Sequence, residues 1–440
     1  MTRGATPERG SPHRLLRLLL VLALAALLAV GLGALALSLA HRGDAPPQLA
    51  AAAESPASPD QVRRGQYLAR AGDCIVCHTT AGGKPFAGGV ALPTPFGTLY
   101  SSNLTPDRET GLGTWSAGDF WRAMHHGVGR DGRMLYPAFP YPNYTRVTRE
   151  DSDALFAYLQ ALAPVPQPNR PHEVRFPYNT QIALAAWRAL YFTPGDPAAD
   201  PRRSAEWNRG AYLVEGLGHC SACHSPRNAL GATSAAHALE GGRIPQQGWY
   251  APSLHAAHEA GLGAWSVPDI VQLLRVGVAP GASVSGPMAE VVSQSLQYLS
   301  TTDLQAMAVY LKALPQTGGA PEPAPVADAA VLARGGTIYA ARCAQCHGDT
   351  GQGTPGLYPA LAGNRAVALP QADNVVQMIL RGGYQAQTAG NPRPLGMPPF
   401  QHLLDDGEVA AVASFVRASW GHVAPPVSAL EVQRVKESSP

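Results

Sequence analysis

Hydrophobic and polar residues alternate with a helical period in two stretches that each begin with an aspartate, 151–162 and 303–314. Each stretch carries a Tyr-Leu pair at the same place, and the spacing of its apolar positions predicts an amphipathic helix. A third stretch, around Phe415, has a similar arrangement of apolar residues. Upstream, Ser58 and Gln61 bracket a capping box with proline at the first helical position, which predicts the start of another helix. The pattern therefore indicates a largely helical protein.

The chain repeats itself at intervals too long for a short structural repeat. Gly-Leu-Gly-Thr-Trp-Ser at 111–116 returns as Gly-Leu-Gly-Ala-Trp-Ser at 261–266, and Arg-Gly-Gln-Tyr at 64–67 returns as Arg-Gly-Ala-Tyr at 209–212. A more divergent third copy keeps the Arg-Gly pair at 334–335. Repetition of this kind predicts three copies of one fold.

One glycine recurs in the predicted leading helix of every copy. Gly65, Gly210 and Gly335 each remove a side chain where this helix would cross the closing helix tightly. The aromatic residue of the closing helix is expected to pack in the resulting notch. These aromatic residues are Tyr158, Tyr310 and Phe415.

The N-terminal region predicts a membrane anchor. Residues 18–40 form an uncharged run of 23 residues, about 34 Å long as a helix, against a bilayer core of about 30 Å. Basic residues precede this run, which predicts a cytoplasmic N-terminus within segment 1–44 and export of all that follows. A cleaved signal peptide with a small-residue site at 34–36 is the alternative. Residues 45–57, rich in Ala and Pro, indicate a flexible tether.

Composition excludes some classes of function. The net charge is +2 and charged residues make up 15% of the chain, so there is no basic footprint for a nucleic acid. Glycine and proline number 46 and 41, which is high for a helical protein and predicts loop-rich pockets.

All six cysteines fall into three copies of Cys-x-x-Cys-His. This motif is typical of covalently attached haem c, in which two thiols bond the porphyrin and the adjacent histidine ligates the iron. The alternatives are a zinc knuckle, a dithiol redox pair or structural disulfides. Zinc ribbons need two such pairs close in sequence, and a redox pair needs no histidine, so we expect three covalently bound haems c. The predicted residues are Cys74, Cys77 and His78, then Cys220, Cys223 and His224, then Cys343, Cys346 and His347.

A methionine on the opposite face usually completes a low-spin haem for electron transfer. Met288 and Met397 lie in loops rich in Gly and Pro downstream of the second and third motifs, and we predict that both are axial ligands. The first unit has no methionine in the matching window. Met134 lies slightly too early and is the predicted ligand, with a histidine or an open site as alternatives. Met124 is expected to pack in the core.

These observations divide the chain into three tandem domains in an all-α fold. The predicted domains span 58–163, 203–316 and 327–422. A Pro-rich connector at 164–202 contains an apolar strap, 182–192, too short to cross a membrane. A linker at 317–326 and a loose tail at 423–440 complete the chain.

The motifs resemble the triple-haem cytochrome c subunit of bacterial membrane-bound dehydrogenases for alcohol, gluconate, sorbitol and aldehydes. The resemblance covers residues 60–422 and implies class I cytochrome c-like domains that face the periplasm from the cytoplasmic membrane. It implies electrons taken from a large catalytic subunit (a quinoprotein, a flavoprotein or a molybdenum hydroxylase) and passed to ubiquinone or an oxidase. The residues that carry it are Leu135-Tyr136-Pro137-Ala138, Gly218-His219-Cys220, Gly286-Pro287-Met288-Ala289 and Met397-Pro398-Pro399-Phe400.

One departure bears on the partner. Members that serve alcohol dehydrogenases commonly have methionine where this chain has Phe139, whereas the Phe form resembles cytochromes paired with molybdenum hydroxylases. We therefore expect a membrane-anchored electron relay without substrate chemistry of its own. The alternatives are a peroxidase-like first haem with an open iron face and a freely diffusing electron shuttle.

Overall fold

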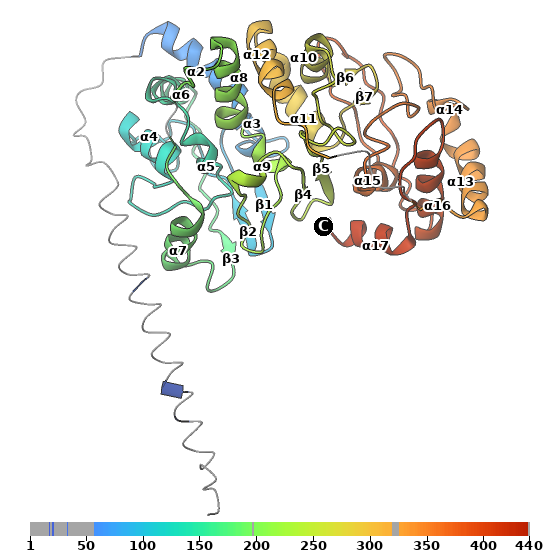
Figure 1. The fold of residues 1–440 in the computed structure, drawn as a ribbon. Helices are drawn as coiled ribbons and strands as arrows, with labels where there is room; N and C mark the ends of the chain where they lie inside the picture. The colour runs from blue at the N-terminus through green and yellow to red at the C-terminus, as the bar shows by residue number, and fades with distance from the viewer. Residues whose placement is uncertain are drawn as a thin grey trace, which may run out of the picture.

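The computed structural model describes residues 57–195, 198–318 and 325–438, with a few isolated positions nearer the N-terminus. These residues form a row of three units, blue to teal, green to yellow, and orange to red in Figure 1. Below, first, second and third unit denote residues 58–163, 203–316 and 327–422. Each unit has its own cluster of buried hydrophobic residues. The core of the second unit also takes in Ala71 of the first unit and Ala386 of the third, so neighbouring units pack directly on one another.

Each unit is built on two crossing helices, as the sequence pattern predicts. The leading helix precedes the cysteine motif and the closing helix ends the unit. In the second unit the leading helix continues as one π-helical segment, η1 (Tyr212–Leu217). The pairs are α2 (Pro59–Ala71) with α6 (Arg149–Gln160), α8 (Ala205–Ala211) with α12 (Thr301–Lys312), and α13 (Ala329–Arg342) with α16 (Asp406–Ala418).

The glycine notch is confirmed in all three crossings. A Cβ on Gly65 would lie 1.8 Å from the carbonyl oxygen of Ala154 and 2.8 Å from the Cβ of Tyr158. The corresponding distances to backbone oxygen are 2.0 Å at Gly210 and 2.2 Å at Gly335. No side chain fits at such distances, so glycine is required for the helices to approach this closely.

The crossing also carries a recurring ion pair that the sequence analysis missed. An arginine one residue before the notch glycine pairs with the third residue of the closing helix, which is acidic in every unit. The first two pairs are Arg64 Nε to Asp151 at 2.7 Å and Arg209 Nε to Asp303 at 2.8 Å. The third is Arg334 with Glu408 at 3.4 Å. A carboxylate in the first turn also complements the helix dipole.

The other elements lie between these pairs. The longer helices are α4 (Ala117–His126), α7 (Gln181–Tyr191), α10 (Val267–Val276), α11 (Pro287–Gln294), α15 (Asp373–Arg381) and α17 (Ala429–Glu437). The short ones are α3 (Cys74–Cys77), α5 (Tyr141–Tyr144), α9 (Ser221–His224), η2 (Ala235–His237), η3 (Leu296–Tyr298) and α14 (Ala344–His347).

The all-α prediction misses seven short strands in the described part of the chain. The antiparallel sheet β1-β2-β3 comprises Ala91–Thr94, Gly97–Tyr100 and Glu173–Val174. The hairpins are β4 (Gly242–Ile244) with β5 (Trp249–Ala251), and β6 (Val278–Ala279) with β7 (Ala282–Ser283). Strands this short carry too few residues for a period-2 pattern to be recognised.

The predicted strap in the connector is confirmed as helix α7. On one side Phe192 meets the ring of Tyr141 edge-on at 4.9 Å in the first unit. On the other side Trp187 Nε1 donates to the carbonyl of Leu230 in the second unit at 3.0 Å. Ile182 and Leu190 remain 64% and 68% exposed, so one apolar face of the helix is not covered by the described residues.

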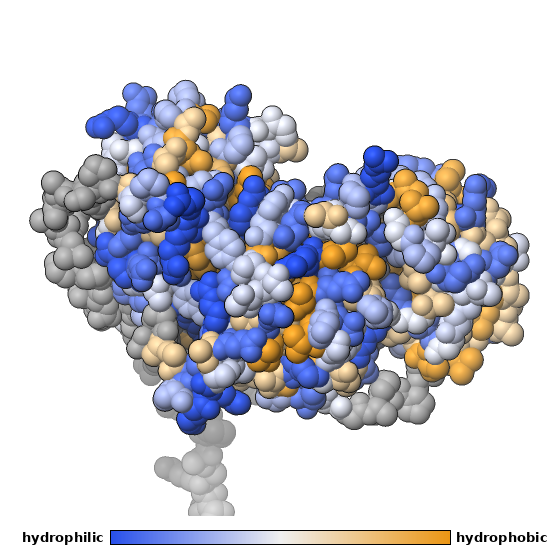
Figure 2. Space-filling model, turned by 90° about the horizontal axis from the view of Figure 1, so that it is seen from above, coloured by the Kyte–Doolittle hydropathy of each residue, from blue (hydrophilic) through white to orange (hydrophobic). Residues whose placement is uncertain are grey.

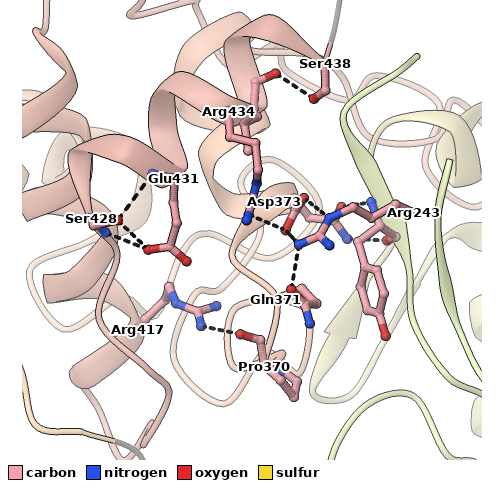
Figure 3. Close-up of polar contacts among 12 residues, drawn as sticks. Arg243, Pro370, Gln371, Asp373, Arg417, Ser428, Glu431, Arg434 and Ser438 are labelled. Atoms are coloured by element: carbon pink, nitrogen blue, oxygen red, sulfur yellow. Dashed lines mark hydrogen bonds and ion pairs between the residues drawn. The ribbon is translucent and has the colours of Figure 1, made fainter. Parts of the chain in front are cut away.

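The prediction of a loose C-terminal tail is wrong, because residues 429–437 form helix α17. Its Val432 and Val435 are buried in the core of the third unit. Figure 3 shows how the helix joins the second unit: Arg434 of α17 and Arg243 of β4 both face Asp373, at 3.8 Å and 2.8 Å. The polar residues of this short segment hid its two buried valines from a reading based on composition.

The predicted anchor at 18–40 lies almost entirely outside the described residues. Within the described ranges, no helix has the length and apolar character needed to cross a membrane. Figure 2 shows the row from above, where hydrophobic side chains gather in the middle and along the right-hand edge and hydrophilic ones prevail in the left-hand part.

Candidate haem sites

Each Cys-x-x-Cys-His motif forms a single helical turn directly after a leading helix. The turn is closed by a bond from the histidine N–H to the carbonyl of the first cysteine. The donor to acceptor distances are 3.1 Å for His78, 2.9 Å for His224 and 2.9 Å for His347. Residues three and four apart share one helix face, so both thiols and the imidazole of a motif are presented together.

The three histidines have the same hydrogen-bond partner type. Each Nδ1 lies close to a backbone carbonyl oxygen that comes later in the same unit: Ser102 at 2.7 Å, Pro252 at 2.7 Å and Pro359 at 3.0 Å. Because a carbonyl only accepts, Nδ1 carries the proton, and the lone pair of Nε2 is left for a metal. This fits iron ligation at all three motifs.

Burial keeps these imidazoles neutral. It lowers the pKa of His78, His224 and His347, and this effect outweighs the hydrogen bond to the carbonyl, which raises the pKa. A neutral imidazole is the form that ligates iron.

Burial raises the pKa of five cysteine thiols in these motifs, those of Cys74, Cys77, Cys220, Cys223 and Cys343. It raises the pKa of Cys74 and Cys220 to about 12 and that of Cys77 and Cys343 to about 11, with neighbouring acidic groups adding to the effect. Zinc ribbons hold their metal with four Cys or His ligands. Within the described ranges there is no cluster of three or more His, Cys, Asp or Glu that could hold a metal ion. The sites therefore fit haem attachment better than a zinc ribbon.

The methionine segments follow α4, α10 and α15. Each of these helices ends at a glycine with positive φ, at 127, 277 and 382, and the chain then turns back in a short antiparallel pairing. Met397 pairs with Gly383 and contacts the core of the third unit. Met288 is the second residue of α11, whose N-cap is Gly286. A Cβ on Gly286 would lie 2.6 Å from the ring of Trp249.

Met134, like Met397, pairs with the residue that follows the capping glycine. The two pairings differ in type, because Gly383 and Met397 exchange both backbone hydrogen bonds whereas the bonds in the first unit flank the pair of Val128 and Met134. Met124 is 5% exposed and belongs to the core of the first unit, as predicted.

Phe139 stands where the second unit has Met288. In the first unit the N–H of Leu135 donates to the carbonyl of Gly127 at 2.8 Å. In the second unit the N–H of Val284 makes the same bond to the carbonyl of Gly277 at 2.9 Å. Phe139 comes four residues after the first of these donors, and Met288 four residues after the second. Phe139 packs against Tyr144 with ring centroids 5.4 Å apart.

The first and second motifs lie next to each other. The carbonyl of Gly72, two residues before Cys74, lies 3.4 Å from Nε2 of His219 and accepts from the hydroxyl of Tyr144 at 3.3 Å. The charge of Cys223 contributes to the raised pKa of Cys77, after burial and Asp73. Burial, followed by the charge of Glu290, raises the pKa of Asp73 to about 8.

Sequence reasoning missed the residues that join these two units. Tyr67 of the first unit donates to Asp303 of the second at 2.5 Å, and Tyr212 of the second donates to Asp151 of the first at 2.6 Å. The signal was present in the repeated Arg-Gly-x-Tyr, because a tyrosine repeated on a helix surface marks a contact that both units share.

Helix pairs closed by a glycine notch, each with a Cys-x-x-Cys-His turn, define a c-type cytochrome. The cytochrome c family matches residues 62–163 and 332–420. The gluconate 2-dehydrogenase cytochrome c subunit of Pantoea cypripedii is 40% identical over 391 residues, covering 85% of this chain and 88% of that protein. The chain therefore belongs to the family of cytochrome c subunits of bacterial dehydrogenases, whose haem c is covalently bound.

Two other relatives bear on the choice of partner. The cytochrome c subunit of the quinone alcohol dehydrogenase of Gluconobacter oxydans is 37% identical, covering 93% of this chain and 86% of that protein. A nicotinate dehydrogenase subunit of Pseudomonas putida is 42% identical over 90% of this chain. This chain spans only 33% of that longer protein.

Proposed function

We propose that this chain is a membrane-anchored cytochrome with three haems that relays electrons from a catalytic dehydrogenase subunit to ubiquinone or a terminal oxidase. The single observation that carries the proposal is the shared state of His78, His224 and His347, whose Nδ1 atoms face carbonyl oxygens and leave Nε2 free. Bound haem supplies the one-electron chemistry of iron. The protein supplies ligands, dry surroundings and fixed spacing.

In this proposal each unit is a class I cytochrome c-like domain with one haem on its cysteine pair. Met288 and Met397 complete the second and third sites, and Met134 completes the first. Met134 pairs with the residue after the capping glycine of α4, as Met397 does after α15, and this supports its assignment. The neutral, hydrogen-bonded histidines support low-spin sites with two strong ligands.

The anchor at 18–40 and a periplasmic location are part of the same proposal. They rest on the uncharged N-terminal run and the basic residues before it. The relay would then work at the membrane surface, where ubiquinone and oxidases are found.

Phe139 and the similarity to a nicotinate dehydrogenase subunit favour a molybdenum hydroxylase as the electron donor. A quinoprotein or flavoprotein donor is the alternative, supported by the similarity to the subunits for alcohol and gluconate.

Detergent extraction of the full chain from cells that also express a candidate dehydrogenase tests the proposal. The relay predicts that a large subunit co-purifies and that its substrate reduces the haems of this chain. A haem-loaded chain that no dehydrogenase reduces would contradict the relay. Carbon monoxide binding to one ferrous haem of the wild-type chain would instead favour the peroxidase-like alternative, with an open first site.

A further inference from the structure

The backbone of Met134 faces away from its strand partner. Its pairing with Val128 is flanked by hydrogen bonds from Leu135 to Gly127 and from Gly129 to Arg133, both 2.8 Å. In an antiparallel ladder, a residue between two such bonds belongs to a non-hydrogen-bonded pair. The N–H and the C=O of Met134 therefore point outward and need another partner.

That partner is the side chain of Gln181, the first residue of α7. The N–H of Met134 donates to Oε1 of Gln181 at 2.8 Å, and Nε2 of Gln181 donates to the carbonyl of Met134 at 3.3 Å. The carboxamide thus satisfies both backbone groups of one residue, as a neighbouring strand would.

The third unit makes the corresponding bonds with backbone alone. Met397 donates to the carbonyl of Gly383 at 2.8 Å, and Gly383 donates to the carbonyl of Met397 at 3.0 Å. In the first unit, a side chain from the connector does for Met134 what Gly383 does for Met397.

Helix α7 is firmly held, so it can fix the position of Gln181. Its N-cap Thr180 accepts from the N–H of Ala183 at 3.2 Å. Arg188, 5% exposed, donates to the carbonyl of His126 at 2.5 Å and so ties α7 to the end of α4. The residues just before Met134, Asp131 to Arg133, are exposed and give it little packing.

We infer that Gln181 is a positioning residue for the axial methionine of the first haem, which makes connector helix α7 part of that haem site. The inference rests on the proposed ligation by Met134. Without the two bonds from Gln181, the Met134 segment would explore other conformations, and its sulfur would spend less time within reach of the iron. The first haem would then accept an external ligand more readily.

The experiment uses the full haem-loaded chain with carbon monoxide as the probe of the ferrous haems. Met134→Leu establishes whether Met134 ligates, because loss of the sixth ligand should make one haem per chain reactive. Gln181→Met removes both bonds at similar side-chain size. Gln181→Glu keeps the acceptor for the Met134 N–H and loses only the donor, so it serves if Gln181→Met does not fold. Trp187→Phe is the control, because it removes a hydrogen bond of α7 that does not involve Met134.

The expected result is one carbon monoxide-reactive haem in Met134→Leu and binding to the same haem in Gln181→Met at least ten times faster than in wild type. The rate of carbon monoxide binding to Gln181→Glu should lie between those of wild type and Gln181→Met, and that of Trp187→Phe should match wild type. The reduction potential of the first haem should fall from wild type through Gln181→Glu and Gln181→Met to Met134→Leu, while that of the third haem stays unchanged. If Met134→Leu changes the first haem but neither Gln181 variant does, the inference is wrong and the ligand assignment stands. If Met134→Leu also leaves that haem unchanged, the ligand assignment itself is wrong, and the inference falls with it.

Discussion

Tyr67 and Tyr212 form a reciprocal pair across the junction of the first two units. The hydroxyl of Tyr67 bonds Asp303 and accepts from the N–H of Ser300, the N-cap of α12, at 3.1 Å. The hydroxyl of Tyr212 bonds Asp151 and accepts from the N–H of Thr148, the N-cap of α6, at 3.3 Å. The two units are therefore related at this junction by an approximate twofold axis.

The hydrogen bonds from Tyr67 to Asp303 and from Tyr212 to Asp151, called the tyrosine clasps below, should stabilise the junction. Burial, together with the bonded carboxylate, raises the pKa of both tyrosines, so each hydroxyl remains a donor. A hydrogen bond to a charged group contributes about 1.5–3 kcal/mol. We predict that Tyr67→Phe and Tyr212→Phe each lower the free energy of unfolding of the paired units by about that amount. Denaturant unfolding measures this, with Tyr384→Phe, whose side chain is largely exposed, as the control. Equal losses in all three variants would contradict the clasp.

The clasp at Asp303 should weaken in acid. Burial alone would raise the pKa of Asp303, but the bonds from Arg209 and Tyr67 outweigh burial and hold that pKa below its ordinary value. A depressed pKa contributes stability above the unfolded value of about 3.9, and this contribution is lost as the pH falls through the folded value. The stability difference between wild type and Asp303→Asn should be full at about pH 6, and it should be lost as the pH falls below about 4 and through the folded pKa of Asp303. A difference that stays constant over that range would show that the charge has no part in it.

Gly210→Ala should disrupt the second unit. The added methyl would lie 2.0 Å from the carbonyl oxygen of Ala306, and backbone cannot yield as a flexible side chain would. Overpacking of this kind costs about 1–3 kcal/mol or more. Gly118→Ala is the matched control, because its nearest neighbour would be 3.7 Å away. That variant should be stabilised by up to about 1 kcal/mol. Thermal unfolding of both variants decides the point, and an undisturbed Gly210→Ala would mean that the helices do not cross so closely.

Asp373 should hold the second unit, the third unit and α17 together. It is 3% exposed and faces Arg243 and Arg434, both half exposed. Since solvent screens the arginines, we expect Asp373→Asn to cost about 1–3 kcal/mol, less than a fully buried pair. Limited proteolysis should then cut before α17 sooner than in wild type. Asp349→Asn, at an exposed position, should leave the cleavage rate unchanged.

The repeated part of the architecture could be predicted because each repeat carries its own physical signal. The notch glycines, the closing helices and the capping serine at 58 depend on neighbours a few residues away or on a recurring pattern. The structure places all of them as expected, with helix ends shifted by about two residues.

The rest depends on contacts between distant residues, which one sequence does not display. Nothing local indicates that Arg243 would meet Asp373, or that Gln181 would bond the backbone of Met134. The absence of the clasp in the third unit shows the same limit. Thr337 replaces the tyrosine there, and its hydroxyl donates to the carbonyl of Ala333 in its own helix. The sequence does not show why the third unit lacks the tyrosine, because the role of the tyrosine is visible only at the junction of the first two units.

The number of covalently attached haems decides whether this chain is a triple-haem cytochrome. Intact mass and the haem content of the denatured, mature chain can be measured for wild type and for a variant with Cys220→Ala and Cys223→Ala. We expect three haems on the wild-type chain and two on the variant. A wild-type chain at its bare mass, or one that keeps the same haem content when the second motif is removed, would contradict this expectation.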